Sequence, residues 1–127
     1  AADKANLASI FLLAPTSTKE RIELAAKMGS GFIYCVSRTG VTGARSEMPV
    51  ELRALVERIK AASDLPVAVG FGISKPEHVN FVTQFADGAV VRSALVNVIT
   101  DHAGSADLLQ SAGEFVRDLK TGITRRE

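Results

Sequence analysis

Four short apolar runs, each followed by a helical pattern, constrain the fold of this chain more than any other feature. The runs cover residues 9–13, 32–36, 66–69 and 88–91. Each is too short for a helix and contains the Ile or Val residues typical of buried strands. Strands that alternate with helices form a parallel sheet covered by those helices. The sequence therefore predicts a single α/β domain over residues 1–127, built from four βα units.

The segments between the runs carry the apolar spacing of amphipathic helices. Ser17 with Glu20 and Ser74 with Glu77 have the S-x-x-E spacing of a capping box, which predicts a helix start at both places. Further helices are expected after Pro49, over residues 75–83 and from Ser93. The apolar residues expected to face the sheet from the second helix are Leu52, Leu55, Val56 and Ile59. The stripe expected on the last helix is Leu108, Leu109, Ala112, Phe115, Val116 and Leu119.

The turn after the third run contains two glycines, Gly70 and Gly72, in the sequence G-F-G-I-S. Glycine permits positive φ and lets a ligand approach the backbone closely. The N–H groups at the start of the next helix attract anions, phosphate above all. A tight turn without a ligand is the alternative for this segment.

Two architectures suit this pattern. A four-stranded open sheet fits 127 residues, whereas a (β/α)₈ barrel needs about 250, so the chain could form half of one. The short helix expected after the fourth run favours the barrel, because such barrels often bind phosphate between the last two loops and a short added helix. We therefore expect the C-terminal half of a TIM barrel, with residues 70–74 and 91–94 around the phosphate.

Composition and isolated reactive residues narrow the function. The 15 basic and 14 acidic residues are mixed along the chain, so no stripe for nucleic acid is expected. No apolar run is long enough for a membrane span. The only cysteine, Cys35, fits a reducing compartment and buried packing, so we expect a cytoplasmic protein. His78, expected on a polar part of its helix, and His102, in a loop, have no companions for a metal site.

Four segments carry a resemblance to a known family: residues 12–18 (LLAPTST), 31–44 (GFIYCVSRTGVTGA), 66–74 (PVAVGFGIS) and 87–96 (DGAVVRSALV). In this order they resemble the second half of tryptophan synthase alpha subunits. The resemblance implies a barrel lyase that cleaves indole-3-glycerol phosphate into indole and glyceraldehyde 3-phosphate in tryptophan biosynthesis. It implies no cofactor in this chain. The implied partner is the pyridoxal-phosphate-dependent β subunit, which consumes the indole.

The resemblance also implies roles for single residues. Those implied around the phosphate are Gly43, Gly72, Ser74 and Ser93. Tyr34 and Phe71 are implied in the indole pocket or its wall, and Thr42 is implied to position a catalytic carboxylate when a lid over residues 38–47 closes. For Ser93 a plain N-cap is the alternative, for Tyr34 a core aromatic residue, and for the lid a solvated loop.

Arg92 departs from the family pattern, which usually has glycine immediately before the serine that matches Ser93. The guanidinium could bind the phosphate, crowd its pocket or point into solvent. All three readings stay open at this point.

The acid–base groups of the reaction are missing from the sequence pattern. No Asp or Glu follows the end of a predicted strand, since Asp64 and Asp87 precede strands and Glu47 falls in the lid. The resemblance places the family's catalytic glutamate and aspartate in the N-terminal half, which has no counterpart here. We therefore expect part of a longer alpha chain. The alternatives are a catalytically silent phosphate-binding half-barrel, which could pair with another copy, and a module that docks onto a β subunit.

Overall fold

A computed structural model of the chain describes residues 4–37 and 50–123. Over these residues the strands are β1 (Phe11–Leu13), β2 (Ile33–Val36), β3 (Val67–Gly70) and β4 (Gly88–Ala89). The helices are α1 (Lys19–Met28), α2 (Glu51–Ala62), α3 (Pro76–Thr83), α4 (Ser93–Asp101) and α5 (Leu108–Lys120). Strand and helix alternate as predicted, and each strand lies within or one residue beyond its apolar run.

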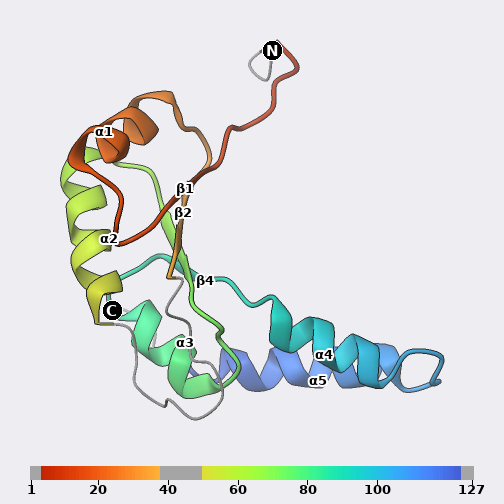
Figure 1. Ribbon diagram of the computed structural model, residues 1–127. Coiled ribbons are helices and arrows are strands. Elements are labelled where there is room, and N and C mark those ends of the chain that lie inside the picture. Colours follow the sequence, from red (N-terminus) through yellow and green to blue (C-terminus); the bar gives the residue numbers. More distant parts are fainter. Residues whose placement is uncertain (1–3, 38–49, 124–127) are drawn as a thin grey trace.

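The strands form one parallel sheet in the order β1-β2-β3-β4. Helices α1 and α2 lie against one face of it, and α3 lies near its lower end (Figure 1). The core between the sheet and these helices contains Ile33, Cys35, Val67 and Val69 from the strands, all at 0% exposure. The predicted face of α2 packs onto them, because its four apolar residues are at most 1% exposed.

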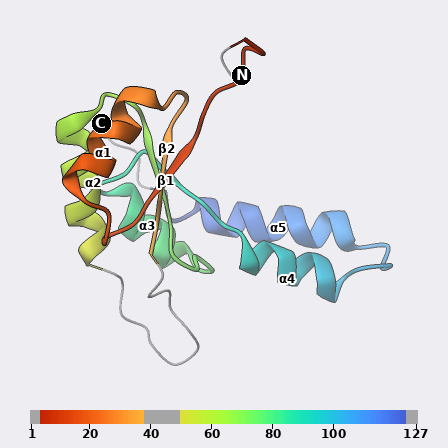
Figure 2. The ribbon, with the colours of Figure 1, turned by 45° about the horizontal axis from the view of Figure 1, so that its top comes forward.

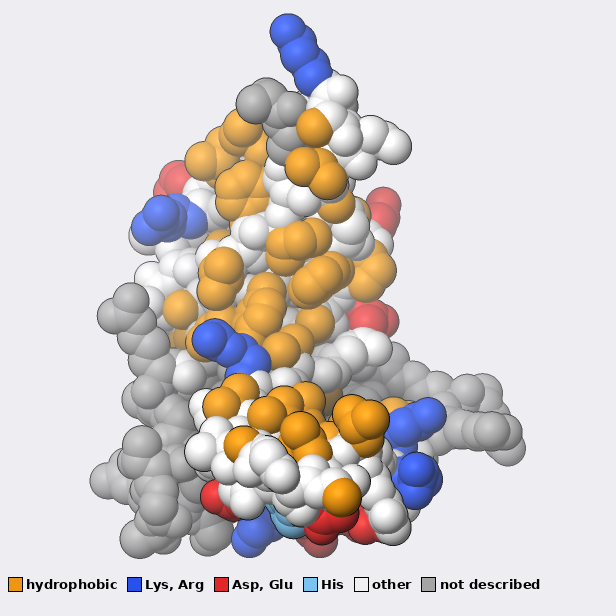
Figure 3. Space-filling model, turned by 90° about the vertical axis from the view of Figure 1, so that its right-hand side faces the viewer, with side chains coloured by type: hydrophobic (Ala, Val, Ile, Leu, Met, Phe, Trp, Pro, Cys, Tyr) orange, Lys and Arg blue, Asp and Glu red, His pale blue; other side chains and the backbone are white. Residues whose placement is uncertain are grey.

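The opposite face of the sheet has no covering helix in the described part of the chain. Leu12, on this face, is 67% exposed, and Tyr34 and Ala68 are half-buried. Figure 3 shows hydrophobic side chains gathered over this side of the molecule. In a complete (β/α)₈ barrel the corresponding face is the packed interior. The open apolar face is therefore that expected of a half-barrel.

Helices α4 and α5 form a hairpin that extends away from the sheet (Figures 1 and 2). No residue of α4 is buried, and its Val96 and Ile99 are exposed. In α5 only Leu119 of the predicted stripe is buried, whereas Leu109 is 85% exposed. The hairpin thus presents apolar side chains that the other described residues leave exposed.

Both predicted capping boxes are wrong. Helix α1 is capped by Thr18, whose hydroxyl accepts the Arg21 N–H at 3.2 Å, while Ser17 Oγ accepts the Ala14 N–H at 2.9 Å. Ser17 therefore closes the turn after β1 and is not available to the helix. Helix α3 has Lys75 at its N-cap with no capping side chain, and the Ser74 N–H, which Glu77 would accept in a capping box, is donated to His78. In the described ranges no helix is long and apolar enough to cross a membrane.

Candidate functional site

A cavity of about 240 Å³ lies where β2, β3 and β4 end, at the carboxyl edge of the sheet. Active sites of parallel α/β folds are built at this edge. The residues that line the cavity are Tyr34, Val36, Ser37, Gly70, Phe71, Gly72, Val90, Arg92 and Ser93. Five of these were predicted as site residues: Tyr34, Phe71, Gly72, Arg92 and Ser93.

Backbone hydrogen bonds hold the three strand ends together. The Ser37 N–H donates to the Gly70 carbonyl at 3.2 Å, and the Val90 N–H donates to the Val69 carbonyl at 2.8 Å. Gly72 follows with a φ of 86°, a conformation that a side chain would strain. The turn therefore needs glycine at this position and brings bare backbone to the cavity.

Helix α4 begins at the same cavity. Arg92 occupies its N-cap position without a capping side-chain hydrogen bond, and Ser93 is the first helical residue. Ser93 is thus not the N-cap, which corrects the alternative reading of that residue. The positive end of the helix dipole and the adjacent guanidinium group both favour an anion here. Both residues are exposed, so a solute can reach them.

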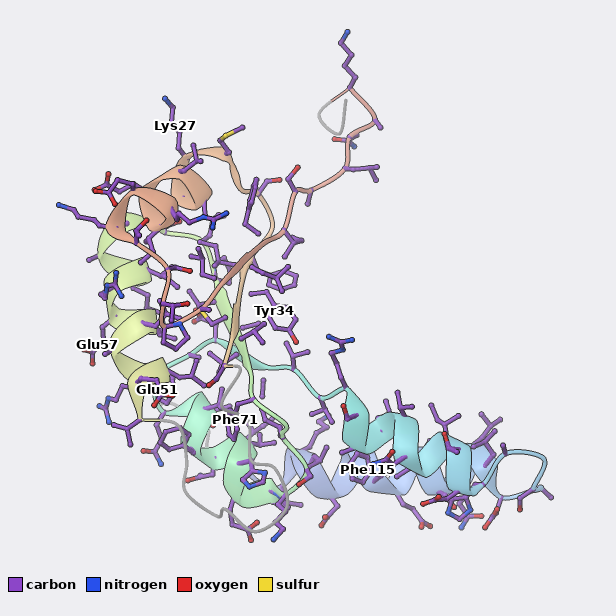
Figure 4. All side chains as sticks on the ribbon, viewed as in Figure 1. Lys27, Tyr34, Glu51, Glu57, Phe71 and Phe115 are labelled. Atoms are coloured by element: carbon purple, nitrogen blue, oxygen red, sulfur yellow. The ribbon has the colours of Figure 1, made fainter. Side chains whose placement is uncertain are left out.

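Tyr34 projects from β2 on the side of the sheet away from α1 and α2 (Figure 4). Its phenol crosses the backbone of β3 at Gly70, where a Cβ atom would lie 2.9 Å from the phenol oxygen. A hydroxyl that can donate and accept hydrogen bonds is thereby placed at the cavity. Tyr34 is half-buried, which places it at the edge of the packed region.

Phe71 and Ser74 face α3. Phe71 is 2% exposed, and its ring packs edge-on against His78 and Phe81. Phe71 therefore forms a wall behind the cavity, next to α3 in Figure 4. Ser74 does not line the cavity, since its N–H donates to His78 Nδ1 at 3.1 Å.

His78 is only 6% exposed, so its expected place on a polar part of the helix was wrong. Burial, followed by the charge of Lys75, lowers the pKa of His78, while Glu77 opposes the shift. The neutral ring that results can accept the Ser74 N–H. The sequence pattern did not predict that His78 accepts this hydrogen bond, because a histidine four residues after Ser74 also fits a solvated helix face.

Two predicted site residues, Thr42 and Gly43, lie outside the described residues, as does the whole predicted lid over residues 38–47. Ser37, in contrast, was not predicted and lines the cavity at 7% exposure. It is the first polar residue after the end of β2, and that position was a usable signal.

No Asp or Glu lines this cavity in the part of the chain that the structure describes. Asp87 lies at the amino edge of the sheet, where its Oδ2 accepts the Val67 N–H at 3.0 Å and lies 3.4 Å from Lys60 Nζ. It therefore ties β3, β4 and α2 together at the end opposite the cavity. The site can bind an anion, but these residues supply no carboxylate for proton transfer.

Other features are poorer candidates. A groove of about 620 Å³ lies between α1 and α2, on the helical side of the sheet. At the junction of α4 and α5, Asp107 from the turn and Ser111 from α5 both approach the Nδ1 atom of His102, at 3.2 and 3.5 Å. A catalytic triad uses opposite ring nitrogens, so this cluster is not one.

Cys35 is fully buried, which raises the pKa of its thiol to about 12 and leaves it unreactive. Within residues 4–37 and 50–123 no group of three potential ligands could hold a metal ion.

Comparisons with known proteins show what the whole chain is similar to. The family model described as "Tryptophan synthase alpha chain" matches residues 1–124. A tryptophan synthase alpha chain from Solibacter usitatus is 49% identical over 123 residues, which are 97% of this chain and 46% of that one. An alpha chain from a Geobacter species is 50% identical over 125 residues, 98% of this chain and 46% of the relative.

Solved structures give the same result. A mutant alpha subunit from the hyperthermophile Pyrococcus furiosus superposes with a TM-score of 0.82 at 35% identity, over 94% of this chain and 47% of that one. A chain of tryptophan synthase from M. tuberculosis superposes with a TM-score of 0.79 at 32% identity, over 96% of this chain and 43% of that one. The chain thus has the fold of part of these proteins and spans less than half the length of each.

Proposed function

This chain belongs to the tryptophan synthase alpha chain family, and from that premise we propose that it forms the phosphate-binding half of an alpha-type lyase. The proposed reaction is the cleavage of indole-3-glycerol phosphate into indole and glyceraldehyde 3-phosphate. The chain would hold the glycerol phosphate end of the substrate. The β subunit would take up the indole.

One observation carries the proposal: Gly72 and the start of α4 meet at one cavity on the carboxyl edge of the sheet. The positive φ of Gly72 exposes backbone there, and Ser93 contributes a hydroxyl and a helix-terminal N–H. Arg92 contributes a full positive charge beside them. A phosphate ester matches this set of donors better than a neutral ligand would.

The proposed division of labour follows from the missing carboxylates. Carbon–carbon cleavage of this substrate needs a proton delivered to the indole ring and another removed from the glycerol hydroxyl, which positioned carboxylates can do. None lines the cavity in the described residues. We assign the acid–base groups to the part of an alpha chain that this chain does not match. The same part would cover the open face of the sheet and the unpaired outer edges of β1 and β4.

The open face and edges are also compatible with a second candidate, a catalytically silent half-barrel that pairs with another copy of itself, although the similarity to alpha chains favours the lyase. Light scattering distinguishes the two, because self-pairing gives twice the 13.4 kDa chain mass.

A third reading, a module that docks onto a β subunit, predicts binding to that subunit without binding of glycerol 3-phosphate. We further propose that the protein is cytoplasmic, because a reducing compartment suits the free thiol of Cys35.

The test is indole release from indole-3-glycerol phosphate, assayed with β subunit present. The purified chain alone is expected to show no turnover. Addition of the unmatched part of the Solibacter usitatus alpha chain is expected to restore it, and that part alone is the control. Turnover by this chain alone would overturn the division of labour. A folded complex of the two parts that remains inactive would reject the lyase proposal.

A further inference from the structure

His78 contacts the glycine turn, residues 70–74, although the proposed reaction gives this histidine no role. The histidine lies in the first turns of α3, four residues after Ser74. Its Nδ1 atom accepts the Ser74 N–H at 3.1 Å, and the side chain is 6% exposed. An accepting Nδ1 means that the neutral ring carries its proton on Nε2. The hydrogen bond thus joins an exposed residue of the turn to a buried ring, and the packing of that ring fixes its direction.

The same ring touches the turn at a second point. The rings of Phe71 and His78 meet edge-to-face, with centroids 5.6 Å apart and planes at 66°. Phe71 also packs against Phe81 of α3, with centroids 6.2 Å apart. Phe71 and Ser74 lie on either side of Gly72, so His78 is in contact with the turn both before and after that glycine. Ile73, between them, is 1% exposed.

The contact also decides which backbone groups can face a ligand. Because the Ser74 N–H is directed at His78, it is not directed at the cavity, which Ser74 does not line. Gly70, Phe71 and Gly72 are the residues of this segment that line the cavity with Arg92 and Ser93, and Gly72 is the one with a positive φ, at 86°. A rotation of the turn would change both assignments together.

We propose that His78 is a positioning residue that holds the turn in its binding geometry by accepting the Ser74 N–H. The proposal deepens the proposed function, on which it rests, and concerns the same phosphate subsite. The histidine itself does not touch the ligand. Its effect on affinity comes from preorganisation, since a turn held in place loses less entropy when the phosphate binds.

Two variants separate positioning from packing. In His78→Asn the side-chain oxygen is attached to Cγ, as Nδ1 is, so it can accept the Ser74 N–H, although the ring is lost. In His78→Phe the ring and its contact with Phe71 remain, but the acceptor is gone. A purely structural role predicts that the phenylalanine variant, which fills the site, is the better binder.

The positioning role predicts the opposite order. Titrated with glycerol 3-phosphate, His78→Phe is expected to bind about tenfold more weakly than the wild type, and His78→Asn within about threefold of it. Amide hydrogen exchange at Ser74 is expected to speed up in the phenylalanine variant and to stay slow in the asparagine variant. Affinities that follow the stability of the variants, or an unchanged affinity in His78→Phe, would overturn the proposal.

The exchange measurement keeps the two proposals apart. If the wild-type chain does not bind glycerol 3-phosphate, the phosphate-binding function is rejected, but the role of His78 in holding the turn is not. The Ser74 amide would then decide the role of His78: protection lost in His78→Phe and kept in His78→Asn supports positioning. Equal protection in all three proteins overturns it.

Discussion

The phenol oxygen of Tyr34 lies 2.9 Å from the point that a Cβ atom on Gly70 would occupy, and two ring carbons of Tyr34 lie 3.5 Å from it. The Tyr34 side chain can thus extend from β2 across β3 only because residue 70 is glycine and has no side chain in its path. Gly70 is not among the described residues with positive φ, so the backbone itself would accept alanine. The glycine is needed there for the position of the tyrosine hydroxyl.

Gly70→Ala is therefore expected to move Tyr34 without unfolding the protein. The clash involves the far end of a half-buried side chain, so the loss of unfolding free energy should be about 1 kcal/mol or less. Tyr34 is the only tyrosine, and the chain contains no tryptophan, so intrinsic fluorescence reports on this residue alone. A changed emission intensity with a nearly unchanged urea midpoint is the expected result.

The double variant Gly70→Ala/Tyr34→Phe is the control for this contact. Removal of the hydroxyl should relieve the clash, so the cost of Gly70→Ala should shrink in the Tyr34→Phe background. Costs that simply add would show that the two residues do not interact as the structure places them.

Ser93→Ala is expected to weaken binding of glycerol 3-phosphate by about 1–2 kcal/mol, since a hydrogen bond to a charged group is lost. This corresponds to roughly a 5- to 30-fold higher Kd in isothermal titration. Ser105→Ala, an exposed serine in the turn between α4 and α5, is the matched control and should bind as the wild type does. Unchanged affinity in Ser93→Ala would remove Ser93 from the phosphate site.

Arg92→Gly introduces the glycine that the family resemblance implies at this position and tests whether the guanidinium binds the phosphate. Because Arg92 lines the cavity but is exposed, its contribution should be about 1 kcal/mol, or roughly fivefold in affinity. Arg92→Lys should retain part of it, and added salt should narrow the difference. A glycine variant that binds equally well or better would show that Arg92 points into solvent or crowds the pocket.

Asp87 is expected to stabilise the fold and not the site, because it lies at the amino edge of the sheet. Asp87→Ala leaves the Val67 N–H without its acceptor and should cost about 1–3 kcal/mol of unfolding free energy. Asp87→Asn keeps an acceptor for the Val67 N–H and loses the half-exposed ion pair with Lys60, so it should cost less. Ligand affinity measured below the unfolding transition should stay constant in both variants; a specific loss of affinity would contradict this separation.

The pKa of His78 predicts how stability depends on pH. Its value in the folded chain is lowered by burial and by Lys75, so below the ordinary value of 6.5 the unfolded chain binds the proton more readily. Stability is therefore fully present above pH 6.5 and falls as the pH drops from there toward the folded pKa. Urea midpoints at pH 7.5 and 5.5 should show this loss in the wild type and a smaller one in His78→Asn. Equal losses in both proteins would argue against a buried neutral His78.

The strands and their helices could be predicted because the spacing of apolar residues and the length of apolar runs follow directly from which residues are buried. The predicted face of α2 is the buried face, and the residues at the ends of β2, β3 and β4 do share one cavity. The capping boxes failed because the Ser17 hydroxyl accepts the Ala14 N–H, and because the Ser74 backbone N–H, the donor that Glu77 would need, goes to the His78 ring. Pattern identifies groups that can make a hydrogen bond but not the partner that folding brings closest.

The surface of α5 shows a different limit. Its apolar stripe has correct helical spacing, yet Leu109 and Val116 are exposed. Periodicity shows that a face is built for burial, and it cannot show whether the covering surface is part of the same chain. The solved relatives that this chain matches are more than twice as long as the part it covers, which is consistent with a cover that lies elsewhere.

The most direct test of the central claim is a map of amide chemical shifts during titration with glycerol 3-phosphate, with glycerol as the control. Shift changes that glycerol does not cause are expected at the amides of Gly72, Arg92 and Ser93. No change at these residues, or changes confined to the groove lined by Lys19, Lys27 and Arg58 between α1 and α2, would contradict it.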